Sequence, residues 1–287
     1  MAKSTSDHRP AERVVNIAAY KFTPLTGLQK RREPLRSLCT SLALKGTIQL
    51  SREGINLFVA GQRAAIGILL DTLQQDVEIG PLQVKRSLSD EQPFNRMLVR
   101  LKKEIVAFGV EGIDPRTHPS RKISPAELQQ WLAEGRTFTL LDVRNQYEVR
   151  LGTFKNAVAL PINHFRHFPA SADQLPADSK KQPVVMFCTG GIRCEKAGPY
   201  LERAGFEDVY QLDGGILKYF QECGEQHFEG ECFVFDKRTA LDGALQETAT
   251  TLCFACQNPL TVEEQASPLY VPGESCPYCS GDAAIPG

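Results

Sequence analysis

A cysteine between a short apolar run and a pair of glycines has the surroundings of a reactive thiolate. The run Val184–Phe187 predicts a buried parallel strand that ends at Cys188. A helical pattern with one apolar face begins near Arg193, after the pair Gly190-Gly191. Loop N–H groups and the positive end of a helix dipole stabilise an anion there and lower the pKa of a thiol. The sequence therefore predicts a nucleophilic thiolate; the alternative is a small buried core residue.

The spacing between this cysteine and the next arginine separates two kinds of cysteine chemistry. Arg193 is the fifth residue after Cys188, whereas cysteine-dependent phosphatases have the arginine at the sixth position, around a wider cradle. The loop is therefore similar to a rhodanese sulfurtransferase loop, in which a thiolate accepts sulfur as a persulfide. Loop N–H groups would stabilise the anionic sulfur, and Arg193 would bind an anionic substrate or order the loop. The loop residues expected in the site are Thr189, Gly190, Gly191, Ile192 and Arg193.

Three further residues are expected to assist this loop. Asp142 and Arg144 end a predicted strand, and their charges suit hydrogen bonds that support the loop. A purely structural salt bridge between the two is the alternative. Cys194 is the sixth residue after Cys188. It either resolves a persulfide or sulfenic state of that cysteine or is inert inside its helix.

Four cysteines near the C-terminus have the spacing of a metal site. Nineteen residues separate the pair Cys253 and Cys256 from the pair Cys276 and Cys279, and each pair has the form Cys-x2-Cys. This spacing is typical of a structural zinc site with four thiolate ligands. Two independent redox dithiols, or simply reduced thiols, are the alternative.

Length and composition indicate a multidomain, soluble, cytoplasmic protein. The chain has 287 residues, of which 42% are hydrophobic and 23% are charged, which suggests two or three globular domains. No run approaches the roughly 20 apolar residues that cross a bilayer, and the N-terminus carries no apolar signal core. Nine cysteines, an odd number, do not suggest a secreted disulfide framework.

Charge is distributed unevenly along the chain. Residues 1–125 contain 20 Lys/Arg against 12 Asp/Glu, a net charge of +8, whereas residues 126–287 contain 13 against 22, a net charge of −9. A basic first half suggests a polyanionic partner such as a nucleic acid, and complementary domain surfaces are the alternative. The residues expected to contact nucleic acid are Arg52, Asn56, Arg96, Arg100, Lys102 and Lys103.

The order of predicted elements gives an α/β protein of three parts. Residues 13–110 follow the order β-α-β-β-α-β, which predicts a ferredoxin-like, acylphosphatase-like α+β domain. A linker over 109–122 leads to residues 121–225, where strands alternate with helices. This alternation predicts a doubly wound parallel sheet with its site at the carboxyl ends of the strands. Residues 226–287 form a small cysteine-rich segment.

Several motifs make the second domain resemble a rhodanese domain over residues 121–225. The motifs are Asp142-Val-Arg144, Glu148, Gly152, Ala157, Pro161, Cys188-x-x-Gly-x-Arg193 and Gly214-Gly215. One departure is Thr153-Phe154 after Gly152, where many rhodaneses have His-Ile.

Further motifs occur along the chain, namely Arg52-Glu-Gly-Ile-Asn56, Leu212-Asp-Gly-Gly-Ile-Leu-Lys-Tyr219, Gly230-Glu-Cys-Phe-Val-Phe-Asp236 and the cysteine pairs. With these motifs, nearly the whole chain resembles one bacterial family, the oxygen-dependent tRNA uridine hydroxylases. The resemblance implies an enzyme that converts the wobble uridine of the anticodon loop to 5-hydroxyuridine, with molecular oxygen as co-substrate and Cys188 as the essential residue.

The chemistry of the residues alone predicts persulfide formation on Cys188 and does not predict hydroxylation. The sequence contains no flavin, dinucleotide or haem motif, so oxygen activation does not follow from it. Two other functions remain open. One is a rhodanese-type sulfurtransferase or persulfide carrier, which would need a sulfur or electron donor. The other is a non-catalytic tRNA-binding module.

Overall fold

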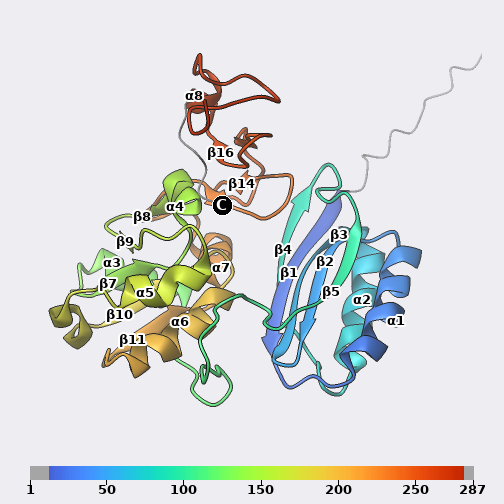
Figure 1. Cartoon of the computed structure of the whole chain (residues 1–287), viewed down its shortest axis with the longest axis horizontal. Helices are drawn as coiled ribbons and strands as arrows, with labels where there is room; N and C mark the ends of the chain where they lie inside the picture. The colour runs from blue at the N-terminus through green and yellow to red at the C-terminus, as the bar shows by residue number, and fades with distance from the viewer. Residues whose placement is uncertain (1–12, 281–287) are drawn as a thin grey trace, which may run out of the picture.

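A computed structural model describes residues 13–280 of the chain. Residues 281–287, the end of the expected cysteine-rich segment, lie outside the described part. The chain forms an α+β sandwich, then a parallel α/β domain, then a small segment of short strands and loops (Figure 1). The α/β class with these three parts, predicted from the sequence, is confirmed.

The first domain is a five-stranded sheet in the order β4-β1-β3-β2-β5. Neighbouring strands are antiparallel except β5, which pairs parallel with β2 and extends the ferredoxin-like arrangement. The elements are β1 (Val14–Phe22), α1 (Leu28–Ser41), β2 (Lys45–Ser51), β3 (Gly54–Gly61), α2 (Arg63–Gln75), β4 (Val84–Ser89) and β5 (Met97–Leu101).

Both helices of this domain cover the same face of the sheet (Figure 1). Strand alternation explains the core, because Ile55, Leu57 and Val59 of β3 pack with helix residues such as Leu69. The side chains between them, including Phe58, project from the opposite, helix-free face. That open face lies toward the second domain (Figure 1).

The second domain is a parallel sheet in the order β6-β11-β10-β7-β9. Separate apolar cores lie on its two faces, one with α5 and α6 and the other with α3 and α7. The elements are β6 (Arg121–Ile123), α3 (Pro125–Ala133), β7 (Thr139–Asp142), α4 (Gln146–Leu151), β8 (Gly152–Phe154), β9 (Val158–Ala159), η1 (Phe165–His167), α5 (Phe168–Ala172), η2 (Ala177–Lys181), β10 (Val184–Phe187), α6 (Ile192–Arg203), β11 (Val209–Leu212) and α7 (Gly215–Cys223).

The C-terminal segment is attached to the second domain through a strand pair. β12 pairs antiparallel with β8, and two further small pairs follow, β13 with β14 and β15 with β16. Within residues 13–280, no helix has the length and apolar character needed to cross a membrane. The elements are β12 (Phe228–Gly230), β13 (Cys232–Phe233), β14 (Ala240–Leu241), β15 (Thr251–Leu252), β16 (Pro259–Leu260) and α8 (Val262–Gln265).

The two large domains are joined by ion pairs around a buried lysine next to the cysteine loop. Lys196 on α6 is only 2% exposed, and its Nζ lies 2.9 Å from Glu53 Oε2 and 2.6 Å from Glu104 Oε1. Tyr20 of β1 donates a hydrogen bond of 3.0 Å to Glu195 Oε1. Beyond β5 the chain enters the second domain, where Phe108 packs in the core beside α5 and α6. The docking of the two domains therefore depends on residues that directly follow the loop.

Replacing Lys196 by methionine should weaken this docking. The change leaves Glu53 and Glu104 without their cation, although both carboxylates are partly exposed. We expect a loss of about 1–2 kcal/mol in the free energy of unfolding, measured by urea denaturation. Lys155→Met is the matched control, because its exposed ion pair with Glu229 should contribute less than about 1 kcal/mol. Equal midpoints for the two variants would contradict this account.

Candidate active site

Cys188 follows the last residue of β10 and lies at the carboxyl edge of the parallel sheet, as its sequence pattern predicts. The backbone N–H of Gly191 donates to its Sγ at 3.1 Å. Gly191 has a φ of 96°, and an added Cβ would lie 2.9 Å from the Tyr20 hydroxyl oxygen. Only glycine therefore fits both the left-handed turn and the close approach of the first domain.

The environment of Cys188 favours the thiolate. Burial alone would raise the pKa, but the Cys194 thiol, the charge of Arg193 and the N–H groups of Arg193 and Gly191 lower it to about 5. Cys194 is also buried. Burial and the adjacent Cys188 sulfur raise its pKa well above the usual value, so it remains a thiol beside the Cys188 thiolate.

The Arg193 guanidinium is held in an ion pair and is not available to bind a substrate. Its Nη1 and Nη2 donate to the two carboxylate oxygens of Glu148 at 2.6 and 2.7 Å, and both side chains are buried. Glu148 also accepts from the backbone N–H of Asn145 and from the Thr189 hydroxyl. Of the two expected roles of Arg193, the geometry supports ordering the loop. Sequence reasoning missed Glu148 as a site residue, although the capping box Asn145-x-x-Glu148 was a signal.

Asp142 and Arg144 form a separate buried pair. Asp142 accepts from the backbone N–H and the guanidinium of Arg144, at distances from 2.6 to 3.1 Å. Arg144 also donates to the Gly152 carbonyl, and Thr153 donates its hydroxyl to Asp142. Within the described part of the chain, neither side chain makes a hydrogen bond to residues 188–193. The pair therefore braces the segment between β7 and β8 and supports the loop only through that segment.

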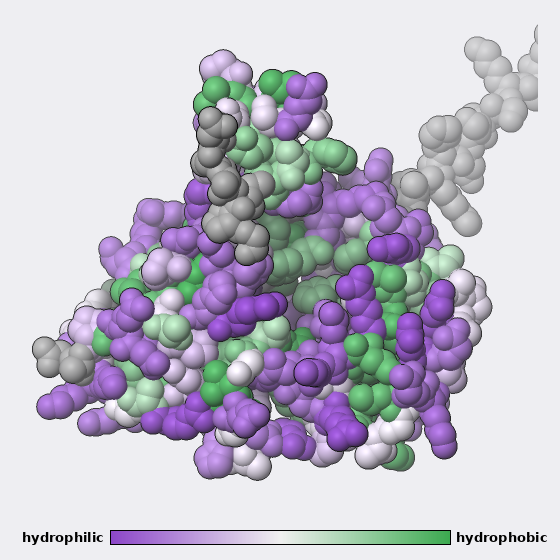
Figure 2. Space-filling model, viewed as in Figure 1, coloured by the Kyte–Doolittle hydropathy of each residue, from purple (hydrophilic) through white to green (hydrophobic). Residues whose placement is uncertain are grey.

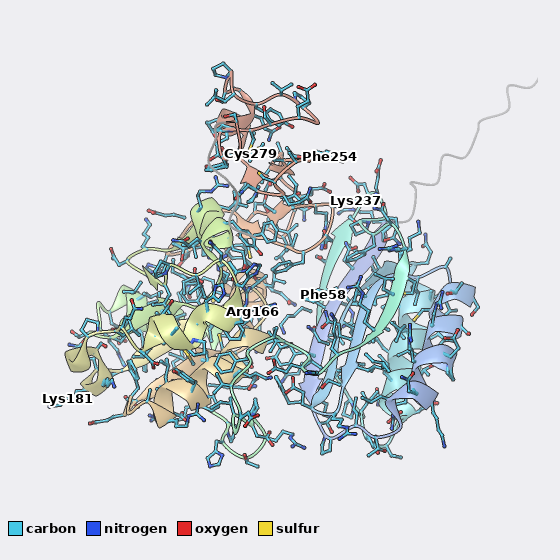
Figure 3. The ribbon with its side chains drawn as sticks, viewed as in Figure 1. Phe58, Arg166, Lys181, Lys237, Phe254 and Cys279 are labelled. Atoms are coloured by element: carbon cyan, nitrogen blue, oxygen red, sulfur yellow. The ribbon has the colours of Figure 1, made fainter. Side chains whose placement is uncertain are left out.

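A cavity of about 540 Å³ separates the open face of the first sheet from the Cys188 loop. Figure 2 shows the surface hollowed between the two domains, and Figure 3 shows Phe58 and Arg166 on its two sides. Three of the six expected nucleic-acid residues line it, namely Asn56, Arg100 and Lys102. The other three, Arg52, Arg96 and Lys103, are exposed but do not line it.

Two residues of the first domain reach the site without having been expected there. Tyr20 and Lys85 line the cavity with Cys188, and Lys85 Nζ lies 5.0 Å from the Tyr20 ring centroid. Burial lowers the pKa of Lys85 to about 8, against the opposing effects of Cys188 and Asp213. Alternation along β4 gives Lys85 the same face as Ala18 of β1, but the sequence does not reveal that this face meets another domain.

The four C-terminal cysteines form a compact cluster. All four Sγ atoms lie within 4.8 Å of one another, and three of the separations are 3.5, 3.7 and 3.9 Å. Four sulfurs at about 2.3 Å from a tetrahedral ion are about 3.8 Å apart. The cluster therefore has the dimensions of a four-thiolate metal site. Cys253, Cys256, Cys276 and Cys279 are the residues that would hold the ion.

Fold and loop together define the class of protein. Residues 14–105 match the UPF0176 acylphosphatase like domain, and residues 124–222 match the rhodanese-like domain. A solved rhodanese-like domain from Anabaena is 27% identical, covering 39% of this chain and 80% of that chain, with a TM-score of 0.33. By its two matched domains, the chain is a rhodanese-superfamily protein with an acylphosphatase-like first domain.

Similarity over nearly the full length defines the family within that class. The chain is 48% identical over 273 residues to the tRNA uridine(34) hydroxylase of Cupriavidus necator, covering 93% of this chain and 97% of that protein. It is 46% identical over 280 residues to the tRNA uridine(34) hydroxylase of Burkholderia vietnamiensis, covering 94% and 99%. The chain belongs to the tRNA uridine(34) hydroxylase family, and the resemblance inferred from its motifs is confirmed.

The low pKa of Cys188 predicts an unusual alkylation profile. The thiolate is the reacting form, so the rate with iodoacetamide should be half-maximal near pH 5 and constant at neutral pH. Peptide mass spectrometry can follow this site separately from the other cysteines. Cys223 is the internal control, because burial raises its pKa and its rate should still increase above pH 9. A Cys188 midpoint near the roughly 8.5 of a free thiol would contradict the assignment.

Proposed function

We propose that this protein is an oxidoreductase that hydroxylates the wobble uridine of tRNA to 5-hydroxyuridine in the cytoplasm. The observation that carries the proposal is the near full-length identity to tRNA uridine(34) hydroxylases. The Cys188 thiolate is the reactive group of the site, and the cavity beside it is the proposed position of the target nucleotide.

The geometry of the cleft supports an RNA substrate. The cavity is of a size that suits a nucleotide, and cationic side chains from both domains line it: Arg100, Lys102 and Lys85 from the first, Arg166 from the second. An unpaired base in an anticodon loop can leave its stack and enter such a pocket while cations contact the phosphates. We propose phosphate contacts for Arg100 and Lys102, and not for the three expected residues outside the cavity. Asn56 lines the cavity but is buried, and its amide nitrogen donates to the Ile105 carbonyl at 3.0 Å.

Molecular oxygen is the proposed co-substrate. Inserting one oxygen atom at C5 of uracil leaves the second atom to be reduced to water, which requires two electrons from a donor. Such a donor is therefore a proposed partner of the protein. The residues of this chain position the thiolate and the base, and we assign them no part in oxygen activation. Arg193 and Glu148 order the loop, the Gly191 N–H holds the sulfur, and Cys188 presents a thiolate to the base.

A sulfurtransferase is the second candidate, favoured by the loop itself. A thiolate of low pKa that accepts an N–H hydrogen bond is suited to carrying a persulfide. Thiosulfate would supply the sulfur and cyanide would accept it. Turnover of this pair with unchanged tRNA nucleosides would favour this candidate over the hydroxylase.

Nucleoside mass spectrometry of total tRNA tests the main proposal. Cells that lack the protein should lose 5-hydroxyuridine and nucleosides derived from it, provided no second pathway supplies them. Wild type should restore them, whereas Cys188→Ala should leave them at background because the thiolate is gone. Unchanged nucleosides in the deletion strain, with redundant pathways removed, would refute the hydroxylase function.

The same assay separates cavity residues from other basic residues. Arg100→Glu with Lys102→Glu should reduce the modification at least about 10-fold, because two proposed phosphate contacts become repulsive. Arg52→Glu with Arg96→Glu makes the same change in net charge outside the cavity and is the matched control. Equal effects would indicate that overall charge, and not the cleft, attracts tRNA.

We also propose that the four-cysteine cluster holds a structural zinc ion. The sulfur separations fit a tetrahedral thiolate site, and the segment has only a small apolar cluster of its own. When bound, the ion would cross-link the two Cys-x2-Cys turns and stabilise the segment.

Metal analysis tests the zinc proposal directly. Protein purified without chelators should contain about one zinc per chain, and Cys276→Ser should lose most of it because a ligand is removed. The segment from residue 253 onward should then become sensitive to protease. Cys223→Ser, which alters a cysteine outside the cluster, should keep the metal. A metal-free wild-type protein would end the proposal.

A further inference from the structure

The motif Gly230–Asp236 stands out in the sequence, yet neither the Cys188 chemistry nor the metal cluster uses it. In the structure this motif places Phe235 in the wall of the cavity that contains Cys188. The Phe235 side chain is 49% exposed, and this exposed ring lies in the cavity wall. An exposed aromatic ring beside a reactive thiolate is suited to contacting a ligand.

Phe235 is supported from behind by other rings. The Phe233 ring lies edge-to-face with it, at 5.1 Å between centroids and 85° between planes. Phe233 in turn packs against Tyr147 at 5.3 Å. The Arg193 guanidinium carbon lies 5.9 Å from the Phe235 centroid, so the ring also contacts the loop arginine. These contacts limit rotation of the ring and keep part of it open to the cavity.

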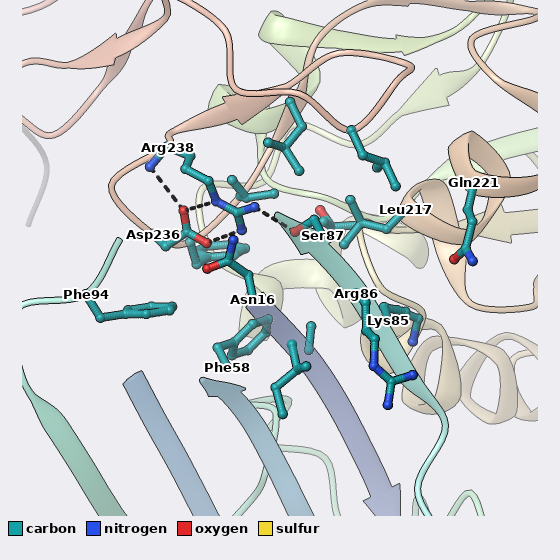
Figure 4. Close-up of a pocket in the computed structure, with 17 residues that line it drawn as sticks. Asn16, Phe58, Lys85, Arg86, Ser87, Phe94, Leu217, Gln221, Asp236 and Arg238 are labelled. Atoms are coloured by element: carbon teal, nitrogen blue, oxygen red, sulfur yellow. Dashed lines mark hydrogen bonds and ion pairs between the residues drawn. The ribbon is translucent and has the colours of Figure 1, made fainter. Parts of the chain in front are cut away.

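The backbone on the other side of Phe235 is tied to the first domain. Asp236 forms a bidentate ion pair with Arg238. Arg238 Nη1 then donates to Ser87 Oγ of β4 at 2.7 Å (Figure 4). The ring is therefore held at the junction of the second domain, the C-terminal segment and the first sheet. Its position is set by all three parts of the protein.

The other residues that line the cavity suit a ligand that has both an aromatic ring and a negative charge. Phe58 on the open sheet face lines the same cavity, while Arg100 and Lys102 supply positive charge. Aromatic side chains stack on nucleobases, and neighbouring cations bind the backbone phosphates. Among possible ligands, a nucleotide matches both features.

We propose that Phe235 is the stacking platform for the target uracil. This inference rests on the proposed tRNA function and specifies where the base lies: against the Phe235 ring, within the cavity that contains Cys188. The ring orients the base, so Phe235 sets which nucleotide of the loop faces the thiolate. The motif Gly230–Asp236 thus belongs to substrate recognition.

A double-mutant cycle between protein and RNA tests the stacking. The probe is a fluorescent anticodon stem-loop with uridine at position 34, compared with the same RNA made abasic at that position. Phe235→Ala should weaken binding of the uridine RNA about 5- to 150-fold, the range for losing one base–aromatic stack. The same variant should bind the abasic RNA within about 2-fold of wild type, because no base is left to stack.

Three variants act as controls. Phe235→Tyr retains the ring and should bind like wild type. Phe235→Leu retains apolar volume without the π face and should resemble Phe235→Ala. Phe254→Ala removes a phenylalanine that is 77% exposed in the same C-terminal segment but does not line the cavity, and it should have no effect.

The outcomes separate this inference from the proposed function. Equal losses of affinity for uridine and abasic RNA in Phe235→Ala would overturn the stacking role. So would full affinity of that variant, provided wild type modifies the uridine RNA. If wild-type protein neither binds nor modifies the stem-loop, and cells lacking it retain 5-hydroxyuridine, the proposed function itself fails.

Discussion

The buried ion pair between Arg193 and Glu148 is the interaction on which the active site depends. It joins the loop after β10 to the first turn of α4, across 45 residues of sequence. Both partners are satisfied, because Glu148 also accepts from Asn145 and Thr189. Losing one partner would leave the other as an uncompensated buried charge, at a cost of about 3–5 kcal/mol. The same arginine charge stabilises the Cys188 thiolate, so loop order and reactivity share one cause.

A second constraint is the order of residues on α6. Arg193 orders the loop, Cys194 contacts the nucleophile, and the next two residues, Glu195 and Lys196, bind the first domain. One helical turn therefore connects the sulfur to the domain interface. The cavity is completed by Tyr20 and Lys85, which belong to that first domain. The rhodanese-like domain supplies the thiolate, and docking supplies the opposite wall.

Features that are local in sequence were predictable, and features that depend on docking were not. The loop Cys188–Arg193 is a contiguous motif between a strand and a helix, so its position could be inferred from pattern alone. The spacing of the four cysteines likewise indicated their cluster. The Glu148 partner was not inferred, because its link to the loop exists only in three dimensions. Arg100 in β5 and Lys102 directly after it were expected to contact nucleic acid, but the sequence does not show which side of this segment faces the thiolate. Lys85 was missed for the same reason.

The full engagement of Arg193 by Glu148 has a consequence for substrate choice. A small anion reaching the sulfur meets N–H groups but no uncommitted guanidinium in the loop. The positive charge available to a ligand is instead on Arg100, Lys102, Lys85 and Arg166, in the walls around the cavity. A ligand that contacts all of these cations must bridge the two domains, because Arg166 belongs to the second domain and the other three to the first. Because this positive charge is spread over walls from both domains, the cavity favours an extended polyanion over a compact anion.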